Sequence, residues 1–316
     1  MLASRGPVCF TVAVALALQP DPTVLRRLYE EGLARREHQY GVSDVRTARA
    51  ASDLGLFLRE QGDEGGARKA LAEALTVDEK ALGPTAQTTL ADAGELAAVS
   101  EPAAAEPLWL RAAESPDAGI AARALGALGE LREAASDRDG AVQFYRRALA
   151  KEEIAGGKEG ARVAVRLNAL ALALGPETGI PLLTRALTID RRVWGERHPE
   201  TATAETNLSG LLLAAGRTDE SVRMGRAALA GFEATLGADH PRTAGSASNL
   251  ADALRAHGDR AGAERLYRRA LEIDERAYGP QHPETLNDVR NLADFLRETG
   301  RASEAQELER RLTGIR

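Results

Sequence analysis

A 42-residue repeat constrains this chain more than any other feature of its sequence. Three segments, beginning at Gly195, Gly237 and Gly279, align without gaps. They share a His-Pro pair near the start, an Asn-Leu pair further on, and a glycine near the middle. The frame is held by His198, His240 and His282, by Thr201, Thr243 and Thr285, and by Gly216, Gly258 and Gly300. Such a chain must fold by stacking equivalent pieces, because one repeat cannot bury its own apolar face.

The same frame reaches back through the rest of the chain with uneven regularity. It is regular at 41–83 and 195–316 and degenerate at 84–194, where short deletions near Ser100, Ser115 and Gly175 are needed to keep the alignment. Before Gly41, the segment LYEEGLARREHQYG matches the second half of a repeat. The sequence therefore predicts one domain over 20–316, built from half a repeat and seven more or less complete ones.

Each repeat predicts two helices. In the repeat from Gly237, apolar residues recur at helical spacing in two stripes, and the composition favours Ala and Leu over aromatics, which make up only 4% of the chain. Gly258 and Gly279 are expected to close the two helices as left-handed caps. Small residues recur where the helices must cross closely. They are Ala67, Ala105, Ala141, Ala263 and Ala305, with Ala74, Ala112, Ala148, Ala186, Ala228 and Ala270.

This small–aromatic–small pattern resembles the tetratricopeptide repeat. The 42-residue length, the GxxHPxTAxxxxNLA motif and the AExLYRRALEIxExxxG segment are similar to the kinesin-light-chain type of that repeat. The resemblance covers about residues 28–316 and is strongest from 195 onward. It implies an all-α, right-handed α-α superhelix with a groove that binds a peptide or protein. It does not imply motor transport, since the N-terminus looks like a signal and no heptad region is present to pair with a motor.

Residues 1–19 have the layout of a secretory signal peptide. Arg5 precedes a largely apolar run at 8–18 that contains small-x-small patterns. The run is shorter than the roughly 20 apolar residues that a transmembrane helix needs. We therefore expect export, periplasmic or secreted, with no membrane span in the mature chain; the location is cytoplasmic if 1–19 is not a signal. Cys9, the one cysteine, lies inside the run, so the mature chain would have no thiol.

Few motifs in the sequence carry chemistry. The histidines of the His-Pro pairs recur at helix starts, too far apart for one metal ion. Residues 136–140 resemble a calcium loop only in part, and 156–160 lack the spacing of a phosphate-binding loop. A net charge of −6 argues against a general nucleic-acid surface. The sequence predicts no enzyme, no catalytic residue, no cofactor, no metal and no nucleic-acid partner.

The first helix of each pair carries the candidate binding residues, just before a buried leucine and about one helical turn beyond it. They are Asn207, Asn249 and Asn291, followed by Asp252, Arg255, Asp294 and Arg297. The family resemblance implies that the asparagines hydrogen-bond to the backbone of an extended peptide, since an amide both donates and accepts. The alternative is that they bridge neighbouring repeats or face solvent. The charges either select charged ligand side chains or serve only solvation.

These observations favour a non-enzymatic scaffold that binds a protein or peptide partner in its concave groove. Two other interpretations stay open. The chain is a regulatory subunit whose chemistry belongs to a separate enzyme, or a structural spacer whose groove binds nothing.

Overall fold

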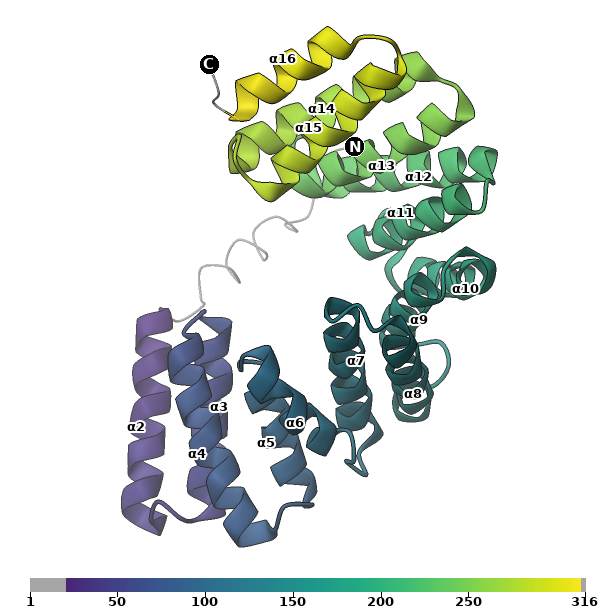
Figure 1. Cartoon of the computed structure of the whole chain (residues 1–316). Helices are drawn as coiled ribbons and strands as arrows, with labels where there is room; N and C mark the ends of the chain where they lie inside the picture. Colours follow the sequence, from purple (N-terminus) through teal and green to yellow (C-terminus); the bar gives the residue numbers. More distant parts are fainter. Residues whose placement is uncertain (1–20, 314–316) are drawn as a thin grey trace, which may run out of the picture. The chain divides into compact units, whose positions relative to one another are not determined.

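The computed structural model describes residues 21–313, with side chains through 310, and in this range the chain forms fifteen α-helices and no strand (Figure 1). They are α2 (Pro22–Tyr40), α3 (Val45–Glu60), α4 (Glu64–Leu82), α5 (Gln87–Ala97), α6 (Pro102–Ala112), α7 (Ala118–Ala134), α8 (Arg138–Gly156), α9 (Ala161–Leu174), α10 (Pro176–Trp194), α11 (Pro199–Ala214), α12 (Thr218–Leu236), α13 (Pro241–His257), α14 (Arg260–Tyr278), α15 (Pro283–Glu298) and α16 (Ala302–Thr313). After α2 the helices follow as seven pairs. The predicted all-α class, with half a repeat and seven helix pairs, is confirmed.

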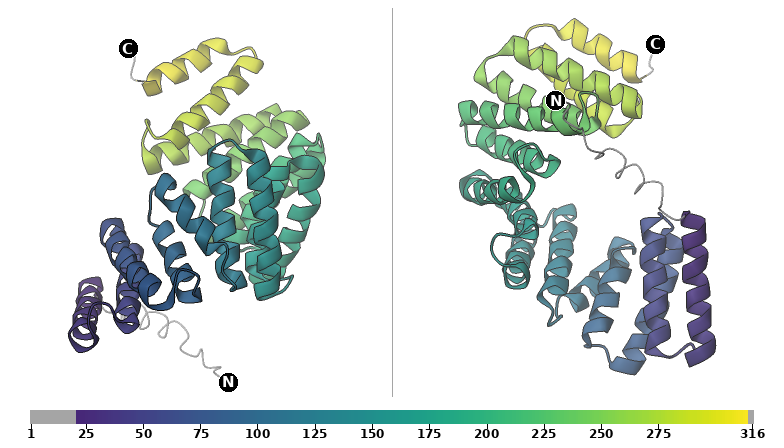
Figure 2. Two further views of the ribbon diagram at one scale, coloured as in Figure 1. Left: turned by 60° about the horizontal axis from the view of Figure 1, so that its bottom comes forward. Right: turned by 180° about the vertical axis from the view of Figure 1, so that it is seen from behind.

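The helices group into two compact units, residues 1–131 and 132–316. From α2 to α6 in the first unit, and from α8 to α16 in the second, each helix contacts the next one in the chain. Within the first unit the purple helices α2, α3 and α4 lie side by side in every view, and within the second unit the yellow-green helices α14, α15 and α16 do the same (Figures 1 and 2). The division falls within α7, in the part of the sequence where the repeat is degenerate.

Two sequence predictions concern the membrane and export. Across the described residues, every helix is too short or too polar to cross a lipid bilayer. The predicted signal peptide at 1–19 lies outside the described residues.

The alanines predicted at the helix crossings are all buried, with at most 3% of their surface exposed. In α10 and α12, Gly179 and Ser221 occupy the place that Ala263 holds in α14. The Ser221 hydroxyl donates to the backbone carbonyl of Ser209 at 2.9 Å, so its polar atom is satisfied inside the core. A larger side chain at any of these places would push the helices apart.

The turn between repeats depends on a glycine and a buried threonine. Gly258 has the predicted left-handed conformation, with φ 96° and ψ −1°. The prediction for Gly279 was wrong in detail: its φ of 85° is positive, but its ψ of 168° is extended. The extended ψ leads the chain away from α14, and the Gly279 carbonyl accepts a 2.8 Å hydrogen bond from the Thr285 hydroxyl in α15. Only glycine adopts this backbone conformation readily.

The same bond recurs at five repeat junctions, with lengths of 2.7–2.9 Å. The pairs are Thr47 with Gly41, Thr89 with Gly83, Thr201 with Gly195, Thr243 with Gly237, and Thr285 with Gly279. Each threonine is nearly inaccessible to solvent, so the bond also satisfies a buried hydroxyl. At these five junctions the glycine and the threonine of the sequence frame therefore act together to set how one repeat follows another.

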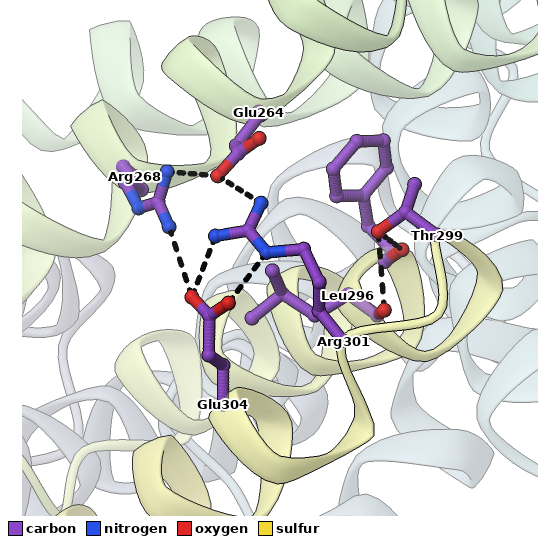
Figure 3. A network of polar contacts seen from close by, with 7 residues as sticks. Glu264, Arg268, Leu296, Thr299, Arg301 and Glu304 are labelled. Atoms are coloured by element: carbon purple, nitrogen blue, oxygen red, sulfur yellow. Dashed lines mark hydrogen bonds and ion pairs between the residues drawn. The ribbon is translucent and has the colours of Figure 1, made fainter.

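A network of ion pairs holds α16 to α14 (Figure 3). Arg301 contacts Glu264 of α14 at 2.7 Å and Glu304 of α16 at 2.5 Å, and Arg268 pairs with Glu264 as well. Partial burial raises the pKa of Glu264, but hydrogen bonds from Arg301 and Arg268 outweigh this and hold its pKa below the usual value. The network adds to the small apolar contribution of α16, in which Ala305 is buried and most of the other described side chains are exposed.

The predicted deletions appear as short helices and a short connection. Helices α5 and α6 have 11 residues each, against 16 and 19 for α3 and α4. Helix α9 has 14 residues, and Gly175 alone separates it from α10. A shorter helix buries less surface against its neighbours, and in a repeat array stability is close to a sum of neighbouring interfaces.

We predict that amide hydrogens of α5 and α6 exchange faster than those of α13 and α14. The reason is the smaller interface of the short helices, which lowers the free energy of local opening. Hydrogen exchange followed by mass spectrometry on the full chain measures this directly. The slowest exchange across residues 97–120 would contradict it.

We predict opposite effects on stability for Gly179→Ala and Gly210→Ala. A Cβ at Gly179 would lie 2.3 Å from the Ala171 carbonyl oxygen and 2.8 Å from Leu211 Cδ1, so alanine should destabilise by about 1–3 kcal/mol. A Cβ at Gly210 would meet nothing within 4 Å on the exposed side of α11, so alanine should stabilise by about 0.5–1 kcal/mol. Thermal unfolding followed by circular dichroism measures both, and equal effects would refute the close crossing at Gly179.

Candidate functional site

The predicted row of asparagines lies at equivalent positions of α11, α13 and α15 in the second unit. The Asn207 amide nitrogen donates to Asn168 Oδ1 in α9 at 2.8 Å, and the Asn291 amide nitrogen donates to Ser248 Oγ in α13 at 3.3 Å. Both bonds run to the preceding first helix, as in the bridging alternative. Asn249 is exposed and makes no side-chain hydrogen bond among the described residues. Of the three, Asn249 is therefore the side chain most available to a ligand.

The predicted charged residues are paired with one another, with the next first helix and with the second helices. Arg255 lies 3.8 Å from Asp252 and 3.7 Å from Glu298, and the Tyr267 hydroxyl donates to Asp252. Burial, together with this hydrogen bond, raises the pKa of Tyr267.

The second predicted pair is arranged in a similar way. Arg297 contacts Asp294 at 2.8 Å and Glu309 at 2.5 Å. Ion pairs exposed to this degree contribute at most about 1 kcal/mol each, so a charged ligand group could replace one partner at little cost.

The histidines of the His-Pro pairs cap helices, as predicted. Nδ1 of His198, His240 and His282 accepts the backbone N–H two residues later, at 3.1–3.3 Å. His198 stacks on Trp194 with ring centroids 4.8 Å apart, and His282 stacks on Tyr278 at 4.3 Å. Among the described residues no cluster of His, Cys, Asp or Glu could hold a metal ion.

The structure contains a column of buried acids that the sequence analysis did not predict. It lies four residues after the buried alanine of each second helix that is 19 residues long. Its members are Asp78 in α4, Glu152 in α8, Asp190 in α10 and Asp274 in α14, with Phe232 in its place in α12. All five side chains are buried. The signal that could have revealed the column is an acid at a constant register on an apolar stripe, where a solvated charge is out of place.

The residue fourteen positions after each acid, in the next first helix, decides how the acid is compensated. At α8/α9 it is Arg166, whose Nε lies 4.0 Å from Glu152. At α4/α5 and α14/α15 it is a second carboxyl, so Asp78 meets Asp92 and Asp274 meets Asp288. At α10/α11 it is Ala204. One position of the repeat thus takes three different chemical forms.

The two carboxyl pairs are chemically alike, although they lie in different units. In each, a serine from the preceding first helix hydrogen-bonds to the second acid: Ser52 reaches Asp92 at 2.8 Å, and Ser248 reaches Asp288. Burial is the main cause that raises the pKa of Asp288 to about 7, and the charges of Asp274 and Glu284 add to it. Burial and Asp78 raise the pKa of Asp92 to about 6. The Asp274–Asp288 pair below about pH 7, and the Asp78–Asp92 pair below about pH 6, is most stable when its two carboxyls share one proton.

Comparison with family models places tetratricopeptide repeats over most of the chain. The description "Tetratricopeptide repeat" matches residues 47–85, 124–159, and the overlapping stretches 161–234, 210–276 and 261–316. The search of curated proteins gave no match.

Solved structures share the fold at low sequence identity. The Podosopora anserina putative kinesin light chain with nearly identical TPR-like repeats is 23% identical, with a TM-score of 0.52 over 61% of this chain and 93% of that one. A Rap protein complexed with Competence and Sporulation Factor is 14% identical, with a TM-score of 0.59 over 85% and 76%. Pseudomonas aeruginosa pilF is 18% identical, with a TM-score of 0.52 over 76% and 95%.

We predict that Asp288→Asn stabilises the protein more at pH 8 than at pH 5. An aspartate in the unfolded chain titrates near pH 3.9, so between about pH 4 and 7 the native state holds a proton that the unfolded state has lost. The free energy of unfolding of the wild type therefore falls as pH rises through this window, whereas Asn does not ionise. The advantage of the variant should grow by about 1–3 kcal/mol.

Urea unfolding at several pH values measures this difference. Asp294→Asn serves as the control, because Asp294 is an exposed carboxyl on the same helix. An advantage of Asp288→Asn that stays constant or shrinks toward pH 8 would contradict the shared proton.

Proposed function

Because the chain belongs to the tetratricopeptide-repeat family, with 42-residue repeats of the kinesin-light-chain-like type, we propose that it is a scaffold that binds a protein or an extended peptide. The binding surface is the face of α11, α13 and α15 that carries Asn207, Asn249 and Asn291. The observation that carries the proposal is the exposed amide of Asn249 in a row whose other two members are anchored to neighbouring repeats.

The chemistry of the row suits a peptide backbone. An amide side chain has two N–H donors and an acceptor oxygen, so it can pair with a peptide unit of any sequence. Asn207 and Asn291 each use one N–H for the neighbouring repeat, which leaves their remaining groups held in a constant orientation. The Asp252–Arg255 and Asp294–Arg297 pairs beside the row can exchange partners with charged ligand side chains.

The comparisons support a binding role at the level of the fold. Tetratricopeptide repeats generally serve as scaffolds without catalytic machinery, and one solved neighbour is a Rap protein in complex with a bound factor. The test below also distinguishes two alternatives to this function. The partner is an enzyme that this chain regulates, or the chain is a spacer without a ligand.

We predict that Asn249→Ala weakens partner binding about five- to 150-fold. A hydrogen bond lost in a buried complex costs about 1–3 kcal/mol. Asn249 makes no hydrogen bond between repeats, so its loss should leave the stability of the free protein unchanged. The partner is first recovered from an extract of the source organism by affinity capture and mass spectrometry, and its Kd is then measured by calorimetry.

Gln306→Ala, an exposed amide on the second helix α16, is the matched control and should bind like the wild type. Equal affinity of wild type and Asn249→Ala would move the binding surface away from the row. Repeated stoichiometric capture of an enzyme would favour the regulatory subunit, and capture of nothing would favour the spacer.

A further inference from the structure

The second unit has a pocket at the one carboxyl position of the buried-acid column that lacks a polar counterpart. It lies between α9, α10 and α11 and has a volume of about 580 Å³. Ala204 stands where α15 has Asp288 and α9 has Arg166, and its small side chain leaves Asp190 facing the open space. The pocket therefore arises from the repeat itself, through removal of one side chain from a regular contact.

Asp190 is buried and unpaired. The residue is 7% exposed, and no hydrogen bond or ion pair connects its side chain to any of the described residues. Every other acid of the column meets a polar partner, Arg166, Asp92 or Asp288. A buried carboxylate without a counter-charge is unfavourable, so a cation that enters the pocket gains the interaction that the fold does not supply.

The other lining groups also suit an organic cation. Glu200 adds a second carboxylate, and the Trp194 indole borders the pocket in an orientation held by its stack on His198. Aromatic faces attract ammonium and guanidinium groups and accept their methylene stems. Arg162, the one cation in the lining, is exposed and forms no ion pair with the described part of the chain, so the lining carries a net negative charge.

We propose that this pocket receives the side chain of a lysine or arginine of the partner, with its charged group at Asp190 and its stem along Trp194. The inference rests on the proposed function, because Asn168 both lines the pocket and accepts the hydrogen bond of Asn207 in the asparagine row. A peptide backbone held by that row would pass the pocket mouth. The asparagine row binds only the backbone of the peptide, and the pocket adds a preference for a basic side chain.

Binding of the basic side chain should weaken in acid. Burial, with a smaller contribution from Glu200, raises the pKa of Asp190 to about 6. The carboxylate is ionised at pH 7.5 and mostly protonated at pH 5, where Glu200, His198 and Arg162 are the other titratable groups facing it. Loss of the negative charge removes the attraction, so affinity should fall as pH drops through 6.

The test uses the two tryptophans of the chain as reporters. The indole N–H signals of Trp194 and Trp109 are followed by NMR, with Trp109→Phe for assignment. The full chain is titrated at pH 7.5 with N-acetyl-lysine methylamide, with the arginine analogue, and with the uncharged norleucine analogue. We expect a saturable shift of the Trp194 signal with a cationic probe, and at least about tenfold weaker binding of norleucine. The lysine and arginine arms show which cation fits better.

Variants separate charge from shape. Asp190→Asn should weaken cation binding at least about tenfold, whereas Asp274→Asn, at the same register in α14, should leave it unchanged. Ala204→Arg copies the Glu152–Arg166 contact inside the pocket, so it should abolish binding and raise the Tm. Equal binding of norleucine, or unchanged binding in Asp190→Asn or Ala204→Arg, would overturn the inference.

The two proposals fail in distinguishable ways. The probes test the pocket without any partner, whereas Asn249→Ala tests the asparagine row with the captured partner. If the probes bind as expected and Asn249→Ala has no effect on the partner, the pocket stands and the proposed binding face is wrong. If Asn249→Ala weakens binding of the partner and the probes do not bind, the proposed binding face is supported and the proposal of a basic side chain in the pocket is wrong.

Discussion

Close crossing of helices through small side chains is the constraint on which the rest of this structure depends. The alanines at the two crossing positions of the repeat are almost fully buried, and glycine or serine replaces them at Gly179 and Ser221. Close contact lets short aliphatic side chains fill the remaining space, which explains how a chain with so few aromatics builds a core. Close contact also makes the stacking of the repeats regular, because each helix pair sets the position of the next.

Regular stacking makes equivalent residues comparable, and the candidate sites arise where equivalent positions differ. The buried acids occupy the same position of the second helices, but the residue that faces them differs from one junction to the next. Below about pH 7 a proton is shared at Asp274 and Asp288, an ion pair forms at Glu152 and Arg166, and a pocket opens at Asp190 and Ala204. Buried charge is costly in every case, so each junction must compensate for it internally or accept a counter-charge from outside. The same physical requirement thus accounts for a structural pair and for a candidate binding pocket.

The asparagine row shows how far sequence reasoning reaches toward a site. Its register follows from the repeat, so the positions of Asn207, Asn249 and Asn291 on the first helices were predictable. The sequence does not decide whether each amide bridges repeats or remains available to a ligand, because this depends on the neighbouring side chain. Asn207 meets Asn168 and Asn291 meets Ser248, whereas Asn249 is exposed. Contacts between residues some forty positions apart in the sequence therefore decide which amide remains available.

The sequence by itself determined the helices, their pairing and the positions of the repeat turns, because these depend on local periodicity and on glycine, proline and threonine at constant spacing. It also located the short helices α5 and α6 through the deletions beside them. Only the tertiary structure decided which acids share a proton, where Gly179 excludes a methyl group, and that Ala204 leaves Asp190 unpaired. The physical reason is that burial and counter-charge belong to the space between helices, and the packing of two repeats creates that space.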